Sequence, residues 1–133
     1  MSSSGSGAVE PTEQQLAELA AIAQGEEDGP LVMLNLNRYL DREAYRRYGE
    51  VALKVLERVG GRILWHAEAH SPVIGDERDA CDEVIAVWYP SAAAFLALAT
   101  DSEILEARGD RVAGLERAAL IRCAAGPEPT LGV

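Results

Sequence analysis

The sequence predicts an α+β fold: a four-stranded antiparallel sheet in the order 4-1-3-2, helices on one face of the sheet, and an extra N-terminal helix. In two segments, residues 31–39 and 62–70, an apolar set of side chains alternates with a set that contains polar side chains, as expected for strands. Helical periodicity precedes the first segment, lies between the two segments and returns after residue 91, and two further strand-like runs complete the pattern. The resulting order, a helix and then β-α-β-β-α-β, is the split βαβ of ferredoxin-like folds.

The N-terminal part of the chain is predicted to contain a short amphipathic helix. Residues 1–11 are rich in serine and glycine and are expected to form a flexible lead-in. Thr12 and Gln15 have the spacing of a capping box, which predicts a helix over residues 12–24. A polar connector ends this segment at residue 28, so we expect the main domain to span residues 29–124.

The strand at residues 31–39 is predicted to lie inside the sheet. One of its faces carries Val32, Leu34 and Leu36, and the other carries Met33, Asn35 and Asn37. We expect the aliphatic face to pack on the helices. The amide face should then lie on the open side of the sheet, where amides need hydrogen-bond partners or a ligand.

Caps and glycines mark the next helix. Asp41 can cap it, apolar residues then recur at helical spacing, and Gly60 ends it. Glu43 and Arg47 are four residues apart, which predicts an ion pair along the helix surface.

The second half of the chain supplies the other strands. Strands at residues 62–70 and 82–89 are expected to form a hairpin around a polar turn. Helical structure is predicted from residue 92 to Gly109. A last strand at residues 115–123 and an extended tail over residues 125–133 complete the prediction.

Composition limits the possible partners. Twelve basic and 22 acidic residues give a net charge of -10, which disfavours binding to nucleic acid or to an anionic membrane. No apolar run is long enough to span a bilayer, and residues 1–9 lack the features of a signal peptide, so we predict a cytoplasmic protein. Cys81 and Cys123 match no zinc or redox spacing and are expected to be reduced.

His66, Asn35 and Asn37 are the candidate site residues. Histidine titrates near neutrality and could accept a proton, and the two asparagines could hold an oxyanion. We therefore predict catalytic roles for His66 and Asn35 and a ligand-binding role for Asn37. The competing interpretation is that these asparagines only satisfy backbone groups, as buried amides commonly do.

No metal or cofactor is predicted. His66, Glu68 and His70 alternate on one strand face, where neighbours are about 7 Å apart, too far for all three to hold one ion. Nucleotide-binding and hydrolase motifs are absent from the sequence.

An aromatic wall and an arginine complete the predicted cleft. Either Trp88 or Tyr89 should face the open side, because neighbouring strand residues point to opposite faces. Arg122 could anchor a carboxylate, although pairing with an acidic residue of the same chain is the simpler account.

Several short motifs together resemble a known family. They are LVMLNLNRY at residues 31–39, Tyr45 and Tyr48, GGR at 60–62, VIG at 73–75, YPSAAAF at 89–95 and RVAGL at 111–115. In this order they resemble the domain-of-unknown-function 1330 family over residues 29–123. The resemblance implies a dimeric α+β barrel, the superfamily that includes small cofactor-independent monooxygenases, muconolactone isomerases, and heme-binding or stress-response proteins.

The predicted function is therefore a homodimer that binds a small apolar or aromatic metabolite in a sheet cleft. We expect pairing through the open face, because Met33, Leu64 and one aromatic side chain would otherwise leave an apolar patch in water. Cofactor-independent acid-base, monooxygenase or isomerase chemistry could follow binding. The alternative is a non-catalytic ligand-sensing or interaction protein of the same fold.

Overall fold

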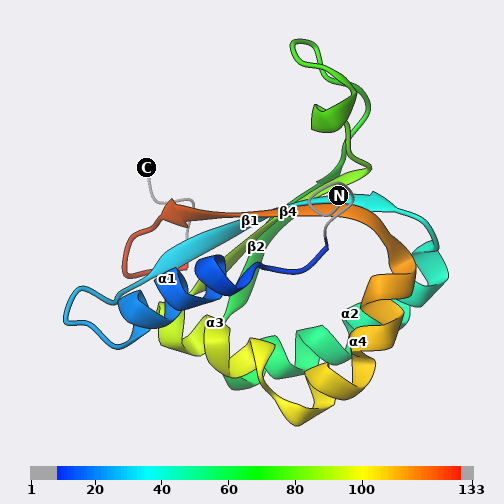
Figure 1. The fold of residues 1–133 in the computed structure, drawn as a ribbon. Helices are drawn as coiled ribbons and strands as arrows, with labels where there is room; N and C mark the ends of the chain where they lie inside the picture. Colours follow the sequence, from blue (N-terminus) through cyan, green and yellow to red (C-terminus); the bar gives the residue numbers. More distant parts are fainter. Residues whose placement is uncertain (1–8, 130–133) are drawn as a thin grey trace.

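The computed structural model describes residues 9–129, which form a four-stranded antiparallel sheet with helices on one side (Figure 1). The elements are α1 (Glu13–Ala23), β1 (Leu31–Tyr39), α2 (Arg42–Arg58), β2 (Arg62–Glu68), β3 (Glu83–Tyr89), α3 (Ala92–Ala99), α4 (Ser102–Gly114) and β4 (Leu115–Ala124). The sheet order is β2-β3-β1-β4, which confirms the predicted order 4-1-3-2. No helix within the described residues is long and apolar enough to cross a membrane.

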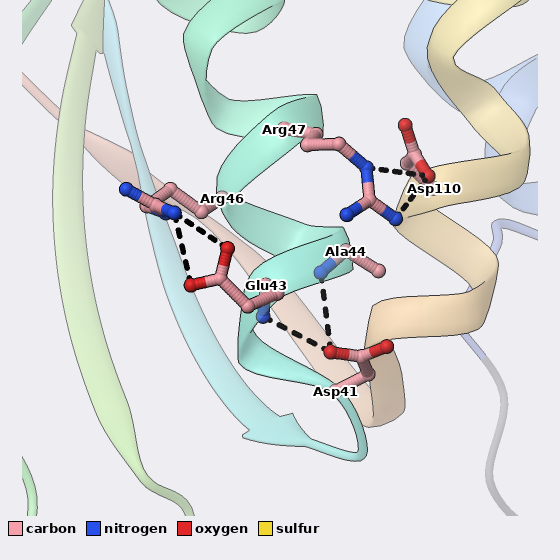
Figure 2. Close-up of polar contacts among 6 residues, drawn as sticks. All are labelled: Asp41, Glu43, Ala44, Arg46, Arg47 and Asp110. Carbon is pink, nitrogen blue, oxygen red and sulfur yellow. Dashed lines mark hydrogen bonds and ion pairs between the residues drawn. The ribbon is translucent and has the colours of Figure 1, made fainter.

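The predicted helix starts are confirmed by their caps. The Thr12 hydroxyl accepts a hydrogen bond from the Gln15 amide at 3.1 Å, and the Gln15 side chain accepts one from the Thr12 amide at 2.8 Å. Asp41 accepts from the first-turn amides of α2 in the same way (Figure 2). Residues 1–8 of the predicted lead-in and 130–133 of the predicted tail lie outside the described residues.

The predicted pair between Glu43 and Arg47 is wrong. Glu43 binds Arg46 instead, and Arg47 reaches Asp110 on α4 at 3.1 Å (Figure 2). Residues three apart on a helix are also neighbours, so Arg46 can form the ion pair with Glu43 while Arg47 links α2 to α4. Both contacts are exposed, so water screens them and they contribute little to the stability of the fold.

The predicted assignment of the two sheet faces is inverted. Leu31 and Met33 lie in the main core with Val55 and Leu56 of α2, so they face the helices. Val32 and Leu34 instead join a cluster with Ala86, Trp88 and Leu64 on the other face, which we call the open face. The alternation of residues predicts which side chains share a face of the strand. Because both faces of β1 are apolar near its start, the alternation could not predict which face the helices cover.

Helix α4 is longer than predicted. Gly109 does not end it, and the helix continues to Gly114, where β4 begins directly. A glycine inside a helix costs about 1 kcal/mol, and the buried Ile104 and the pairing of Asp110 with Arg47 offset that cost.

The connection between β2 and β3 projects from the sheet as an arm, residues 69–82, drawn in green (Figure 1). β2 ends at Glu68, two residues earlier than predicted, and a short 3-10 helix, Glu77–Asp79, lies within the arm. The arm rises on the side of the sheet away from the helices. It therefore borders the open face.

We predict that Gly114→Ala lowers the free energy of unfolding by roughly 1–3 kcal/mol, the usual cost of overpacking. An added Cβ would lie 2.7 Å from the backbone nitrogen of Tyr45 and 2.8 Å from its Cβ, and this backbone cannot move without displacing α2. Urea denaturation measures the effect.

Gly109→Ala is the matched control in the same helix. Nothing lies within 4 Å of a Cβ built there. This variant should gain up to about 1 kcal/mol from helix propensity. Equal effects of the two substitutions would contradict the packing of α4 on α2.

Candidate functional site

Asn35, Asn37 and His66 share one face of the sheet, as predicted, but it is the face toward the helices. In register, Asn35 lies opposite Ile85 of β3, and His66 of β2 lies opposite the same residue. The Asn35 amide donates to the carbonyl oxygens of Met33 at 3.2 Å and Ile85 at 3.4 Å. These bonds favour a structural role for Asn35.

Asn37 belongs to a buried polar contact with α2. Its side chain is only 2% exposed, and its amide nitrogen donates to the Tyr45 hydroxyl oxygen at 3.2 Å. Burial raises the pKa of Tyr45 above its ordinary value, with the neighbouring Tyr48 adding to the effect, so the phenol stays neutral. The rings of Tyr39, Tyr45 and Tyr48 follow one another at centroid distances of 5.0 and 5.6 Å.

His66 is held by a carboxylate at the edge of the sheet. Its Nδ1 lies 3.1 Å from Oε2 of Glu83, and the Tyr39 hydroxyl donates to Oε1 of the same carboxylate. Burial and then this bond raise the pKa of Tyr39, which keeps its hydroxyl a donor. A carboxylate that orients an imidazole leaves Nε2 able to act as a base. The His66 side chain is 64% exposed, however, and its catalytic role and that of Asn35 stay predictions.

The other predicted ligand-binding residues do not join this group. Trp88 faces the open side, and its indole nitrogen donates to the Gly126 carbonyl at 3.1 Å. Tyr89 is buried on the helix side, edge-on to Phe95 at 5.2 Å. Arg122 is exposed and lies opposite Met33, on the helix side of β4.

A cleft of about 200 Å³ lies on the open face, beneath the base of the arm. Its lining residues are Leu36, Arg38, Arg78, Asp79, Ala80, Cys81, Arg117, Ala119 and Ile121. The sequence predicted a cleft on this face, but none of the predicted site residues lines it. The inverted face assignment explains why Asn35 and Asn37 do not reach this cleft, because the residues that alternate with them are the ones on the open side.

Arg38 fastens the arm over the cleft. Its Nε and Nη2 donate to the Ala80 carbonyl at 3.2 and 2.8 Å, and Nη2 also donates to the Glu77 carbonyl. Leu36, Ala119 and Ile121 of the neighbouring strands β1 and β4 supply an apolar floor. The arrangement can hold a small molecule between a fixed loop and a sheet.

Two thiols and several acidic groups lie in the sheet region, but they do not form a metal site. Cys81 lines the cleft, and burial raises the pKa of its thiol, so it is a poor thiolate ligand. Both cysteines are free in the structure. Across residues 9–129, no three His, Cys, Asp or Glu side chains are grouped to hold an ion.

Comparisons with known proteins give a family and a fold. The model of a domain of unknown function (DUF1330) matches residues 31–122. A protein of unknown function from Rhodopseudomonas palustris, RPA0582, is 34% identical over 87% of this chain and 95% of its own, with a TM-score of 0.78. Its methylated form gives 32% identity over 92% and 98%, with a TM-score of 0.80.

A more distant solved structure shares the fold. It is a dabb family protein with a ferredoxin-like fold from Mesorhizobium loti, 15% identical over 74% of this chain and 98% of its own, with a TM-score of 0.53. A search of curated protein sequences finds no match. The predicted resemblance and the ferredoxin-like α+β barrel fold are thereby confirmed.

We predict that Tyr45→Phe lowers the free energy of unfolding by about 1–3 kcal/mol, because it leaves the buried Asn37 amide without its acceptor. Tyr48→Phe is the control, since the Tyr48 hydroxyl makes no hydrogen bond to the described residues. Thermal and urea unfolding of both variants measure the difference. Equal losses would show that the contact between Asn37 and Tyr45 does not stabilise the fold.

Proposed function

Because this chain belongs to the DUF1330 family, whose fold leaves one sheet face uncovered by helices, we propose that it is a homodimer that binds a small apolar or aromatic molecule in the open-face cleft. The position of the cleft is the main support for this proposal. Its floor of Leu36, Ala119 and Ile121 lies on the sheet face that a second copy would cover. Pairing would turn an open hollow into an enclosed site, which is the form that ligand sites usually take.

Exposed apolar side chains support pairing through this face. Ile121 of the cleft floor is 49% exposed. Val73 and Ile74, on the arm beside the open face, are 98% and 94% exposed. Exposed apolar surface is a common feature of interaction sites in soluble proteins. A second copy seated on the open face would meet both the floor of the cleft and the arm.

The position of His66 favours binding over catalysis as the function of this cleft. A catalytic histidine must lie within hydrogen-bond reach of its substrate. His66 and Asn35 share the sheet face toward the helices, whereas the cleft lies on the open face. A ligand-sensing or ligand-carrying role therefore fits the geometry better than acid-base chemistry. The cytoplasmic location stays a prediction.

We predict that Ala119→Phe abolishes binding of a neutral aromatic probe such as indole. The new ring would occupy the floor of a cleft of only about 200 Å³. Isothermal titration calorimetry should show measurable binding of indole to the unmodified protein and at least a tenfold loss in the variant. Ala113→Phe, on the exposed surface of α4, is the control and should bind normally. Unchanged binding by Ala119→Phe would remove the cleft as the site.

We predict a particle of twice the 14.2 kDa chain mass in sedimentation equilibrium. Replacing Val73 and Ile74 together by serine should weaken the dimer, because the arm would lose its apolar contacts with the second copy. Leu53→Ser changes an apolar residue of α2 that is 53% exposed, away from the open face, and should leave the mass unchanged. A stable monomer of the unmodified chain at micromolar concentration would contradict the proposed dimer.

A further inference from the structure

Two arginines lie directly opposite each other in the cleft. Arg38 of β1 pairs in register with Arg117 of β4, so both side chains leave the sheet on the open face. Both residues are half-buried. Like charges at directly opposite positions of an antiparallel pair destabilise a sheet. The chain has 22 acidic residues that could neutralise these two positive charges. We therefore asked whether either arginine is paired with a carboxylate.

Neither arginine forms an ion pair with a carboxylate in the part of the chain that the structure describes. Arg38 donates only to the neutral carbonyls of Glu77 and Ala80, which leaves its Nη1 group without a partner there. Six other arginines do pair with acidic side chains: Arg42, Arg46, Arg47, Arg58, Arg78 and Arg108. The two facing arginines thus differ from most of the other arginines.

The remaining arginines without ion pairs have simpler explanations. Arg62 and Arg122 are exposed, where water solvates a guanidinium. Arg111 lies over the Tyr48 ring at 5.9 Å and donates to the Val9 carbonyl. Only the pair of Arg38 and Arg117 combines opposed like charges with a cleft among the described residues.

The rest of the lining leaves the cleft positive. Arg78 adds a third guanidinium from the arm, paired with Asp76 at 3.4 Å on the surface. Asp79 is the single acidic residue of the lining, and its Oδ2 already accepts a hydrogen bond from the Asp76 amide at 2.9 Å. Guanidinium groups bind carboxylate and phosphate oxygens through paired, charge-assisted hydrogen bonds.

We propose that Arg38 and Arg117 bind an oxyanion, a carboxylate or phosphate, at one end of a small molecule whose apolar body lies on Leu36, Ala119 and Ile121. This inference rests on the proposed function, since it names the class of ligand for the same cleft. The oxyanion removes the repulsion between the two arginines. The cleft volume of about 200 Å³ is below the roughly 300 Å³ of typical ligand pockets, so the ligand is about the size of one substituted aromatic ring.

Isothermal titration calorimetry with benzoate and with benzamide, its neutral analogue, tests this inference on the full chain. The unmodified protein should bind benzoate at least tenfold more tightly than benzamide, and added salt should reduce that preference. Arg117→Gln should abolish the preference, whereas Arg117→Lys should keep part of it. Phenyl phosphate, used in parallel, shows which of the two oxyanions is preferred.

Arg122→Gln is the matched control, five residues further along β4 and on the other face of the sheet. It removes the same charge and should leave benzoate binding unchanged. Without ligand, Arg117→Gln should melt at the same temperature as the unmodified protein or higher, because the substitution relieves the opposition to Arg38. A lower melting temperature would show that Arg117 has a stabilising partner in the free protein and would overturn the inference.

The outcomes also separate this inference from the proposed function. Equal affinities for benzoate and benzamide would overturn the oxyanion site and leave a cleft for neutral molecules intact. Failure of indole, benzoate, benzamide and phenyl phosphate to bind would overturn both. If Arg117→Gln dissociated the dimer and benzoate did not bind, a carboxylate of the second copy would be the counter-ion, and the ligand site would again be excluded.

Discussion

The structure depends on the fact that, among the described residues, α1, α2, α3 and α4 all lie on one side of a single sheet. Every strand must then present one face to a covered core and the other to an uncovered surface. On the covered side, Met33 and Val87 pack on Val55 and Leu56, and Asn37 finds the Tyr45 hydroxyl. On the open side, the same strands carry apolar residues and the two facing arginines. The asymmetry of the layers therefore separates the residues that hold the fold from those available to bind a ligand.

The arm gives the open face its shape. Arg38 uses three hydrogen bonds to backbone carbonyls to hold residues 77–80 beside β1 and β4, and the arm and the sheet together form the cleft. The same side chain contributes positive charge to that hollow. One residue thus both builds the wall of the cleft and sets its electrostatic character, which links the loop conformation to the class of ligand that fits.

Local signals predicted the elements well, whereas long-range relations were not available from the sequence. Asp41 and Thr12 marked helix starts because a cap acts within three residues. The sequence could not show which face of β1 packs on the helices, because Leu31 and Met33 are as apolar as Val32 and Leu34. An irregularity between Ile63 and Trp65 also shifts the register of β2 on β3. The opposition of Arg38 and Arg117 depends on the β1–β4 register, which no local pattern contains.

Arg117, in our proposal, is a cation on the open face that pairs with the anion of a ligand, and NMR of the arginine Nε–H groups observes this pairing directly. Addition of benzoate should shift the Arg117 Nε–H signal and slow its exchange with water, and addition of benzamide should leave it unchanged. A signal that stays in place at saturating benzoate, or that is already protected from exchange in the free protein, would contradict the account.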